Sequence, residues 1–193
     1  MLPGVVLGTL LTPAAAAGAA DGSAAGSAAG AAGCGAAGGG WLAVCVAGRQ
    51  APLWVRSGDL APVPAGPPSG DEALAVARRL HGAAYVWGGL STLGIDCSGL
   101  IHLAWRRLGV RLPRDAHDQS AATTPVPRGG ERPGDLYFFA RPGARPHHVG
   151  IVVTPAAGTT PGRMLHASQA QHRVVEEPMP PERAATLVGV RRP

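Results

Sequence analysis

The sequence predicts an α+β protein in which helices precede an antiparallel sheet. Between residues 70 and 121, apolar residues recur at helical spacing, and Gly or Pro marks the segment ends. From residue 136 onward, short β-rich segments alternate with turns. Helices followed by strands are the order typical of the α+β class. Because residues 1–64 contain short strands and turns, we expect a small all-β domain ahead of the α+β domain.

The domain boundary is predicted from the Pro-rich run PVPAGPPS, which ends at Ser69 and favours a semi-rigid, non-helical linker. The 193 residues suffice for one medium domain and one small domain. We therefore assign residues 1–64 to the β domain, 65–69 to the linker and 70–193 to the larger domain.

In the N-terminal part, strands are expected over Val5–Leu11, Trp41–Val46 and Leu53–Val55. The Ala- and Gly-rich run between residues 14 and 40 has too little apolar bulk to pack, which favours a flexible loop. The order GW-x-x-V, turn, WV-x-x-x-DL resembles the end of a bacterial SH3-type domain. A poorly ordered β-rich extension is the alternative.

The net charge of +5 lies entirely in residues 65–193, but no dense basic run occurs. Nucleic-acid binding is therefore disfavoured, and a mildly basic surface facing an anionic polymer is favoured. No apolar run is long enough to span a membrane. The first residues look like a signal peptide but lack a positively charged start, so we interpret them as a strand or as a chain that begins further upstream.

The larger domain is expected to begin with three helices. Ser69 and Glu72 form a capping box for the first, which ends before Gly82. Asp96 is placed to cap the second, and Gly109 to end it. The predicted helices cover residues 70–81, 97–108 and 114–121. The strands predicted after them are Leu136–Phe139, Val149–Val153, Met164–Ala167, Val174–Glu177 and Leu187–Val190.

Cys97 stands at the start of the second predicted helix. A thiol there is near the positive end of the helix dipole and near unpaired N–H groups, which favour the nucleophilic thiolate. The alternative is an inert core cysteine. Cys34, Cys45 and Cys97 make an odd count without a CxxC motif, which disfavours a disulfide framework or a structural zinc site. A bridge between Cys34 and Cys45 stays open.

Two histidines on neighbouring predicted strands complete a candidate triad with Cys97. His148 precedes VGIVV, and His166 lies in the next segment, RMLHAS. Antiparallel pairing would bring them side by side, with His148 as the base and His166 fixing its tautomer. Because side chains alternate along a strand, we expect His147 to face away. A zinc site made of the same three residues is the weaker alternative.

Six motifs occur in a fixed order along the chain: Y-x-W-G-G, DCSGL, LPRDAHDQ, RPGDLYFF, HHVGIVV and LHAS. Together they closely resemble the NlpC/P60 family of papain-like cysteine peptidases, and the resemblance covers residues 70–192. The resemblance implies a papain-like fold, with helices packed on an antiparallel sheet. It also implies cleavage of peptidoglycan stem peptides, typically between D-γ-glutamate and the diamino acid, without a cofactor.

The resemblance also assigns roles to site residues. It implies Cys97, His148 and His166 as the catalytic triad, and Tyr85 as an oxyanion donor. Asp96 and Ser98 match positions that bind the free amine of an N-terminal L-Ala in members with SH3-type domains. Arg114 and Gln119 are expected to be structural or to line the cleft, and Trp87 to pack in the core.

Residues 1–64 contain no Tyr and no Glu, so the acidic or tyrosine contact that such members add from the SH3-type domain is missing here. A non-catalytic wall-binding protein is the alternative function, and acyl transfer an alternative reaction. We expect a monomer that acts on peptidoglycan peptides or muropeptides in the cell envelope or outside the cell, with cytoplasmic muropeptide recycling as the alternative.

Overall fold

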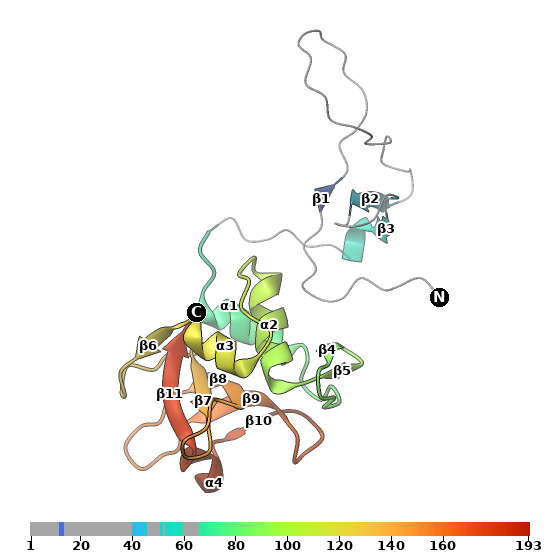
Figure 1. Ribbon diagram of the computed structural model, residues 1–193. Helices are drawn as coiled ribbons and strands as arrows, with labels where there is room; N and C mark the ends of the chain where they lie inside the picture. The colour runs from blue at the N-terminus through green and yellow to red at the C-terminus, as the bar shows by residue number, and fades with distance from the viewer. Residues whose placement is uncertain (1–11, 14–39, 46–50, 52, 60–65) are drawn as a thin grey trace. The chain divides into compact units, whose positions relative to one another are not determined.

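The protein was analysed as a computed structural model that describes residues 12–13, 40–45, 51, 53–59 and 66–193 (Figure 1). The chain divides into two compact units, one within Leu10–Pro62 and one that contains all described residues from 66 onward. None of its described helices is long and apolar enough to cross a membrane.

The described part of the smaller unit is a three-stranded antiparallel sheet of β1 (Thr12–Pro13), β2 (Trp41–Cys45) and β3 (Leu53–Arg56), followed by the 3-10 turn η1 (Ser57–Asp59). The strands predicted over 41–46 and 53–55 are therefore present. Trp41 lies opposite Arg56, whose guanidinium carbon is 5.3 Å from the centre of the indole ring. The predicted strand Val5–Leu11 and the Ala/Gly run at 14–39 lie outside the described residues. An SH3-type barrel contains more strands than these three, so they do not show one.

The larger unit confirms the predicted α+β order. Its six-stranded antiparallel sheet has the order β10-β9-β8-β7-β11-β6, and α1, α2 and α3 gather on one side of it (Figure 1). The helices are α1 (Gly70–Arg78), α2 (Cys97–Arg107), α3 (Ala116–Ala121) and α4 (Pro181–Ala184). The sheet strands are β6 (Thr124–Val126), β7 (Leu136–Phe139), β8 (His148–Thr154), β9 (Arg163–Ser168), β10 (Arg173–Pro178) and β11 (Leu187–Arg192).

The helix ends follow the predicted caps. Ser69 and Glu72 form a complete capping box, and Gly109 adopts a positive φ of 88° after α2. The first helix is three residues shorter than predicted. Beyond Arg78 the chain tightens into i→i+3 bonds, such as Leu80 N–H to Ala77 O at 3.0 Å, before Gly82 turns it at φ 82°.

Four short elements of the larger unit were not predicted. They are α4, β6 and the two-stranded hairpin of β4 (Leu90–Ser91) and β5 (Gly94–Ile95). Each has too few residues to show a hydrophobic period in the sequence.

The sheet carries apolar side chains on both faces, which explains why its central strands are continuously hydrophobic. On β7, Phe138 joins the main cluster between the sheet and the helices, whereas Phe139 joins a smaller cluster on the opposite face. The main cluster includes Leu100 and Ile101 of α2, which are both fully buried. This packing fixes the start of α2 against the sheet.

The turn before β7 packs against the start of α1 at two glycines. A Cβ on Gly134 would lie 2.1 Å from the Gly70 Cα, and Gly134 has a φ of 89°. Only glycine combines this backbone conformation with such close contact. The RPGD motif therefore joins the first helix to the sheet.

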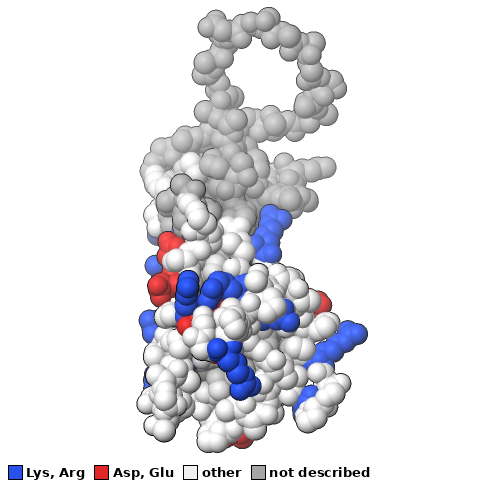
Figure 2. All heavy atoms as spheres, turned by 90° about the vertical axis from the view of Figure 1, so that its left-hand side faces the viewer, with Lys and Arg blue, Asp and Glu red and all other residues white. Residues whose placement is uncertain are grey.

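Positive charge is dispersed over the face of the molecule that Figure 2 shows. On the face shown in Figure 2, Arg side chains alternate with uncharged surface and with acidic groups. This distribution agrees with the lack of a dense basic run in the sequence.

Candidate active site

Cys97 begins α2, as the sequence predicts, and its side chain is buried with 6% exposed. Asp96 caps the helix, because its Oδ1 accepts a 2.7 Å hydrogen bond from the Gly99 N–H. Gly99 allows the loop before the helix to come close, since a Cβ there would lie 2.5 Å from the Gly89 O. The Y-x-W-G-G loop thus packs directly on the first turn of the cysteine helix.

The Cys97 thiol lies beside the start of β8. Among the described residues, β8 pairs with β9 only from Ile151 onward, where it lies opposite Leu165. The Val149 N–H, just before that point, is a hydrogen-bond donor to Cys97. The cysteine is therefore held next to the residue that follows His148.

The pKa of the Cys97 thiol is shifted in the direction opposite to the one that the sequence predicts. Burial raises the pKa of Cys97, and the Asp96 carboxylate raises it further. Hydrogen bonds from the N–H groups of Val149, Ser98 and Cys97 itself oppose this shift without reversing it. The expectation that the helix start lowers the pKa overall is wrong for the free protein, because desolvation outweighs the N–H donors.

His148 and His166 are brought together by β8 and β9. Their Nε2 and Nδ1 atoms lie 2.8 Å apart, and the two rings meet edge to face at 84°. Both side chains are buried, and the Phe139 ring packs 5.7 Å from that of His148. His147 is exposed, in agreement with the predicted alternation along the strand.

The environment keeps both histidines neutral. Burial lowers the pKa of His148 well below its ordinary value of 6.5, and the nearby His166, Arg183 and His147 add to this effect. Burial also lowers the pKa of His166, although a hydrogen bond to Glu177 opposes the shift. A neutral His148 is able to accept a proton from a thiol.

Glu177 is a site residue that the sequence analysis missed. Its Oε1 lies 3.0 Å from the His166 Nε2, so three side chains form a hydrogen-bonded row from His148 outward. Glu177 is on β10, opposite Met164 and two residues from the partner of His166. Strand alternation would have placed it on the histidine face, but only once the register of β9 and β10 was known.

Asp96 and Ser98 lie together with Arg114 in a polar cluster. Arg114 Nη2 is 2.6 Å from Asp96 Oδ2, and Nη1 donates to Ser98 Oγ at 2.9 Å. The Gly88 N–H donates to the same Asp96 oxygen at 2.8 Å. Gln119 Nε2 donates to the Ser98 O at 2.9 Å. Arg114 and Gln119 of the LPRDAHDQ motif therefore hold the first turn of α2.

Tyr85 is half-buried beside this cluster. Burial raises the pKa of its hydroxyl, and the Cys97 and Asp96 charges raise it further, so the hydroxyl remains a donor near the thiol. Trp87 differs from expectation, because 80% of it is exposed. Trp87 lies in the turn that follows Tyr85, and the prediction that it packs in the core is wrong.

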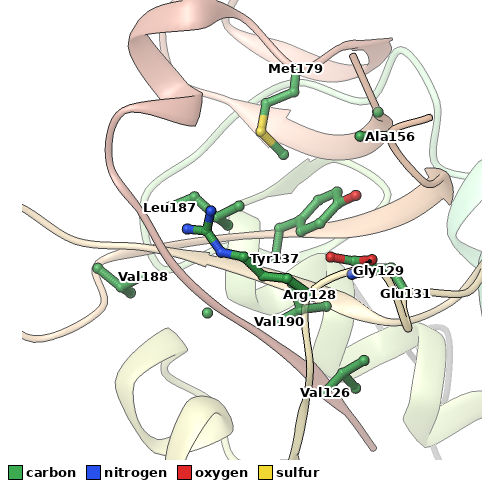
Figure 3. Close-up of a pocket in the computed structure, with 12 residues that line it drawn as sticks. Val126, Arg128, Gly129, Glu131, Tyr137, Ala156, Met179, Leu187, Val188 and Val190 are labelled. Atoms are coloured by element: carbon green, nitrogen blue, oxygen red, sulfur yellow. Dashed lines mark hydrogen bonds between the residues drawn. The ribbon is translucent and has the colours of Figure 1, made fainter. Parts of the chain in front are cut away.

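The polar groups do not form a metal centre in the described part of the chain, where no three His, Cys, Asp or Glu side chains are grouped to hold an ion. A separate cavity of about 500 Å³ lies between the sheet and the segments around Arg128 and Met179 (Figure 3). Tyr137 and Leu187 also line it, but none of the predicted site residues does. The candidate chemistry is therefore outside this cavity.

The NlpC/P60 family pattern matches residues 82–192. The γ-D-glutamyl-L-lysine dipeptidyl-peptidase of Bacillus subtilis is 35% identical over 116 residues, which are 59% of this chain and 37% of that protein. The probable endopeptidase NlpC of Escherichia coli is 34% identical over 47% of this chain and 56% of its own length. The chain thus spans only part of the relatives that it matches.

Solved structures agree in fold. An NlpC/P60 family protein from Bacillus cereus superposes with a TM-score of 0.67 at 26% identity, over 83% of this chain and 52% of that one. The peptidoglycan hydrolase RipB of Mycobacterium tuberculosis gives a TM-score of 0.52 at 30% identity, over 64% of this chain and 63% of its own.

Proposed function

The chain belongs to the NlpC/P60 family, and we propose that it is a cysteine peptidase that hydrolyses peptidoglycan stem peptides. The observation that carries the proposal is the hydrogen bond of 2.8 Å between His148 and His166, next to a cysteine at a helix start. A nucleophile, a base and a group that orients the base are the parts needed for acyl transfer.

In the proposed reaction, the Cys97 sulfur attacks the scissile carbonyl while His148 takes the thiol proton. His166 holds the His148 ring through the hydrogen bond between their nitrogens. The tetrahedral oxyanion accepts hydrogen bonds from the Tyr85 hydroxyl and from backbone N–H groups near Cys97, each worth about 3 kcal/mol of barrier. His148 then gives its proton to the leaving amine, and water hydrolyses the thioester.

The neutral thiol and neutral imidazole fit this sequence of steps. Burial raises the pKa of Cys97 and lowers that of His148, so the proton stays on sulfur in the free enzyme. The proton transfer then accompanies attack. Developing charge is stabilised by the backbone donors that already face the sulfur.

The proposed bond is the one between D-γ-glutamate and the diamino acid. This choice rests on the family resemblance and on the B. subtilis relative, whose name states a γ-D-glutamyl-L-lysine specificity. The same substrate leads us to propose a cell-envelope or extracellular location, with action on muropeptides as the alternative.

We further propose that residues 1–64 form a degenerate SH3-type domain, joined through 65–69 to the catalytic domain of 70–193. The three antiparallel strands of β1, β2 and β3 are compatible with such a module. The B. cereus structure supports this extent, since it superposes on 83% of the chain.

The test is digestion of defined muropeptides followed by mass spectrometry of the products. We expect release of L-Ala-γ-D-Glu from stem peptides by the wild type and no product with Cys97→Ala. Acyl transfer would instead yield products extended by an added amine. Binding to cell walls without any cleavage would contradict the proposal and favour a wall-binding protein.

A further inference from the structure

We propose that Glu177 is a positioning residue that fixes the tautomer of the proposed base, His148, by acting through His166. The inference rests on the proposed function, because it needs His148 as the base of Cys97. It adds a residue that neither the motifs nor the triad contains. The contacts run in one line, with 2.8 Å between the two histidines and 3.0 Å from His166 to Glu177.

The direction of every hydrogen bond in this line follows from Glu177. An ionised carboxylate only accepts, so the proton must sit on His166 Nε2. In a neutral ring the other nitrogen, Nδ1, then carries a lone pair and accepts from the Nε2–H of His148. His148 Nδ1 is left as the acceptor nitrogen of that ring. It is therefore the atom that can take the Cys97 proton.

Neutral rings make this choice of tautomer important. Burial lowers the pKa of both histidines, so each has one proton and one lone pair. If His166 carried its proton on Nδ1, it would donate to His148 Nε2. The His148 proton would then sit on Nδ1, and the ring would have no acceptor for the thiol.

The Glu177 carboxylate is itself held in place. Gln171, in the turn between β9 and β10, donates through Nε2 to Glu177 Oε2 at 2.5 Å. Both carboxylate oxygens therefore have a hydrogen-bond partner, which fixes the orientation of the side chain. Among the described residues, no Arg lies within ion-pair distance of the Glu177 carboxylate, which instead contacts His166.

The neighbouring glutamate provides a matched control. Glu176 lies on the same strand but faces the other way, where its Oε2 lies 2.9 Å from Arg78 Nε. It has the same charge and the same side chain, and it does not contact either histidine. Glu176→Gln therefore reports the effect of removing a carboxylate from β10 without touching the row of contacts.

The tautomers are measured directly by ¹⁵N NMR of the histidine side chains, in full-length Cys97→Ala protein without substrate. We expect His166 and His148 each to carry the proton on Nε2, and Glu176→Gln to leave both unchanged. In Glu177→Ala, and in the bulkier Glu177→Met, we expect a measurable population of His166 with its proton on Nδ1. Retention of the Nε2–H tautomer in a folded variant would overturn the proposal, and the bulkier substitution serves if the Ala variant does not fold.

Kinetic measurements on the enzyme that retains Cys97 distinguish a positioning role of Glu177 from a purely structural role. Loss of a partner that orients a metal-bound histidine typically costs about 10–100-fold, and we expect kcat to fall by a similar factor in Glu177→Ala with KM unchanged. Glu177→Gln keeps an acceptor oxygen and should restore kcat to within about 3-fold. Equal kcat values for Glu177→Ala and Glu176→Gln would contradict the inference. The NMR measurement does not depend on cleavage. It therefore tests the role of Glu177 separately, even if the proposed peptidase function fails.

Discussion

The Nε2 atom of His148 and the Nδ1 atom of His166 lie 2.8 Å apart, although 18 positions separate the two residues. The antiparallel pairing of β8 and β9 produces this contact, and Phe139 closes one side of the pair. A buried pair of neutral imidazoles has a defined proton order only if one ring is fixed by a third group.

The first prediction contrasts two adjacent histidines. His148→Ala removes the proposed base, so kcat should fall by about 10³-fold. His147→Ala changes an exposed side chain on the opposite face and should stay within a few-fold of the wild type. Muropeptide cleavage rates measure both. If the two variants lost equal activity, the assignment of the base would be wrong.

The second prediction links thiol reactivity to the base. Because burial raises the pKa of Cys97, its alkylation by iodoacetamide at pH 7 should depend on proton removal by His148. We expect labelling of Cys97 to slow in His148→Ala and to be unchanged in His147→Ala, as read by mass spectrometry of peptides. Equal rates in all three proteins would mean that His148 does not act on the thiol.

The third prediction concerns the acid side of the pH profile. His148 works when neutral, and its pKa is lowered from 6.5, so the acid limb of kcat/KM should lie below that value. Arg183 is one of the positive groups that lower this pKa, together with His166 and His147. Arg183→Gln should therefore raise the His148 pKa and move the acid limb to higher pH.

The control for this shift is Arg145→Gln, which alters an exposed Arg on the loop before β8 that is not among the groups lowering the His148 pKa. It should leave the acid limb in place. If the acid limb moved to lower pH in Arg183→Gln, or moved equally in both variants, Arg183 would not be a cause of the lowered His148 pKa.

The fourth prediction concerns the Asp96–Arg114 pair. The Asp96 side chain is 9% exposed, so Arg114→Gln leaves a mostly buried carboxylate without its charged partner. The free energy of unfolding should fall by about 2 kcal/mol, less than for a fully buried pair. Arg78→Gln breaks an exposed pair with Glu176 and should cost about 0.5 kcal/mol. Urea denaturation of both variants measures the difference.

Local patterns predicted much of the fold and of the candidate site. The capping box at Ser69, the helix start at Cys97 and the strand at Leu136–Phe139 appear as expected, because each is marked by a residue pattern within a short stretch of sequence. The opposite orientations of His147 and His148 followed from strand alternation alone. These features need no knowledge of which segments pack together.

The missed features depend on tertiary structure. Glu177 reaches His166 only through the register of β9 and β10, which the sequence pattern does not specify. The raised pKa of Cys97 reflects burial between α2 and the sheet, which outweighs the donors that the helix start provides. The contact of Arg114 with Asp96 joins a loop to a helix cap 18 positions away.

The last prediction concerns recognition of a free amine. The family resemblance assigns Asp96 to the ammonium group of an N-terminal L-Ala, yet Asp96 already accepts from Arg114, Gly88 and Gly99. Its charge is shared with the Arg114 guanidinium 2.6 Å away, so a substrate ammonium gains less from it than from an unpaired carboxylate. Losing one charge-assisted hydrogen bond costs about 1.5–3 kcal/mol, and we expect the lower end here. L-Ala-γ-D-Glu peptides with a free amine should thus be cleaved about tenfold faster, in kcat/KM, than their N-acetylated forms.

Asp96→Asn separates recognition from capping in this experiment. Asn caps helices as well as Asp does, so α2 should remain folded while the negative charge is lost. The preference for the free amine should then shrink toward equality, with the rate on the acetylated peptide changing less than the rate on the free one. If the wild type cleaved both peptides equally, Asp96 would have only a structural role, through its contacts with Gly99 and Arg114. The enzyme would then be expected to act on intact, amide-linked wall peptides.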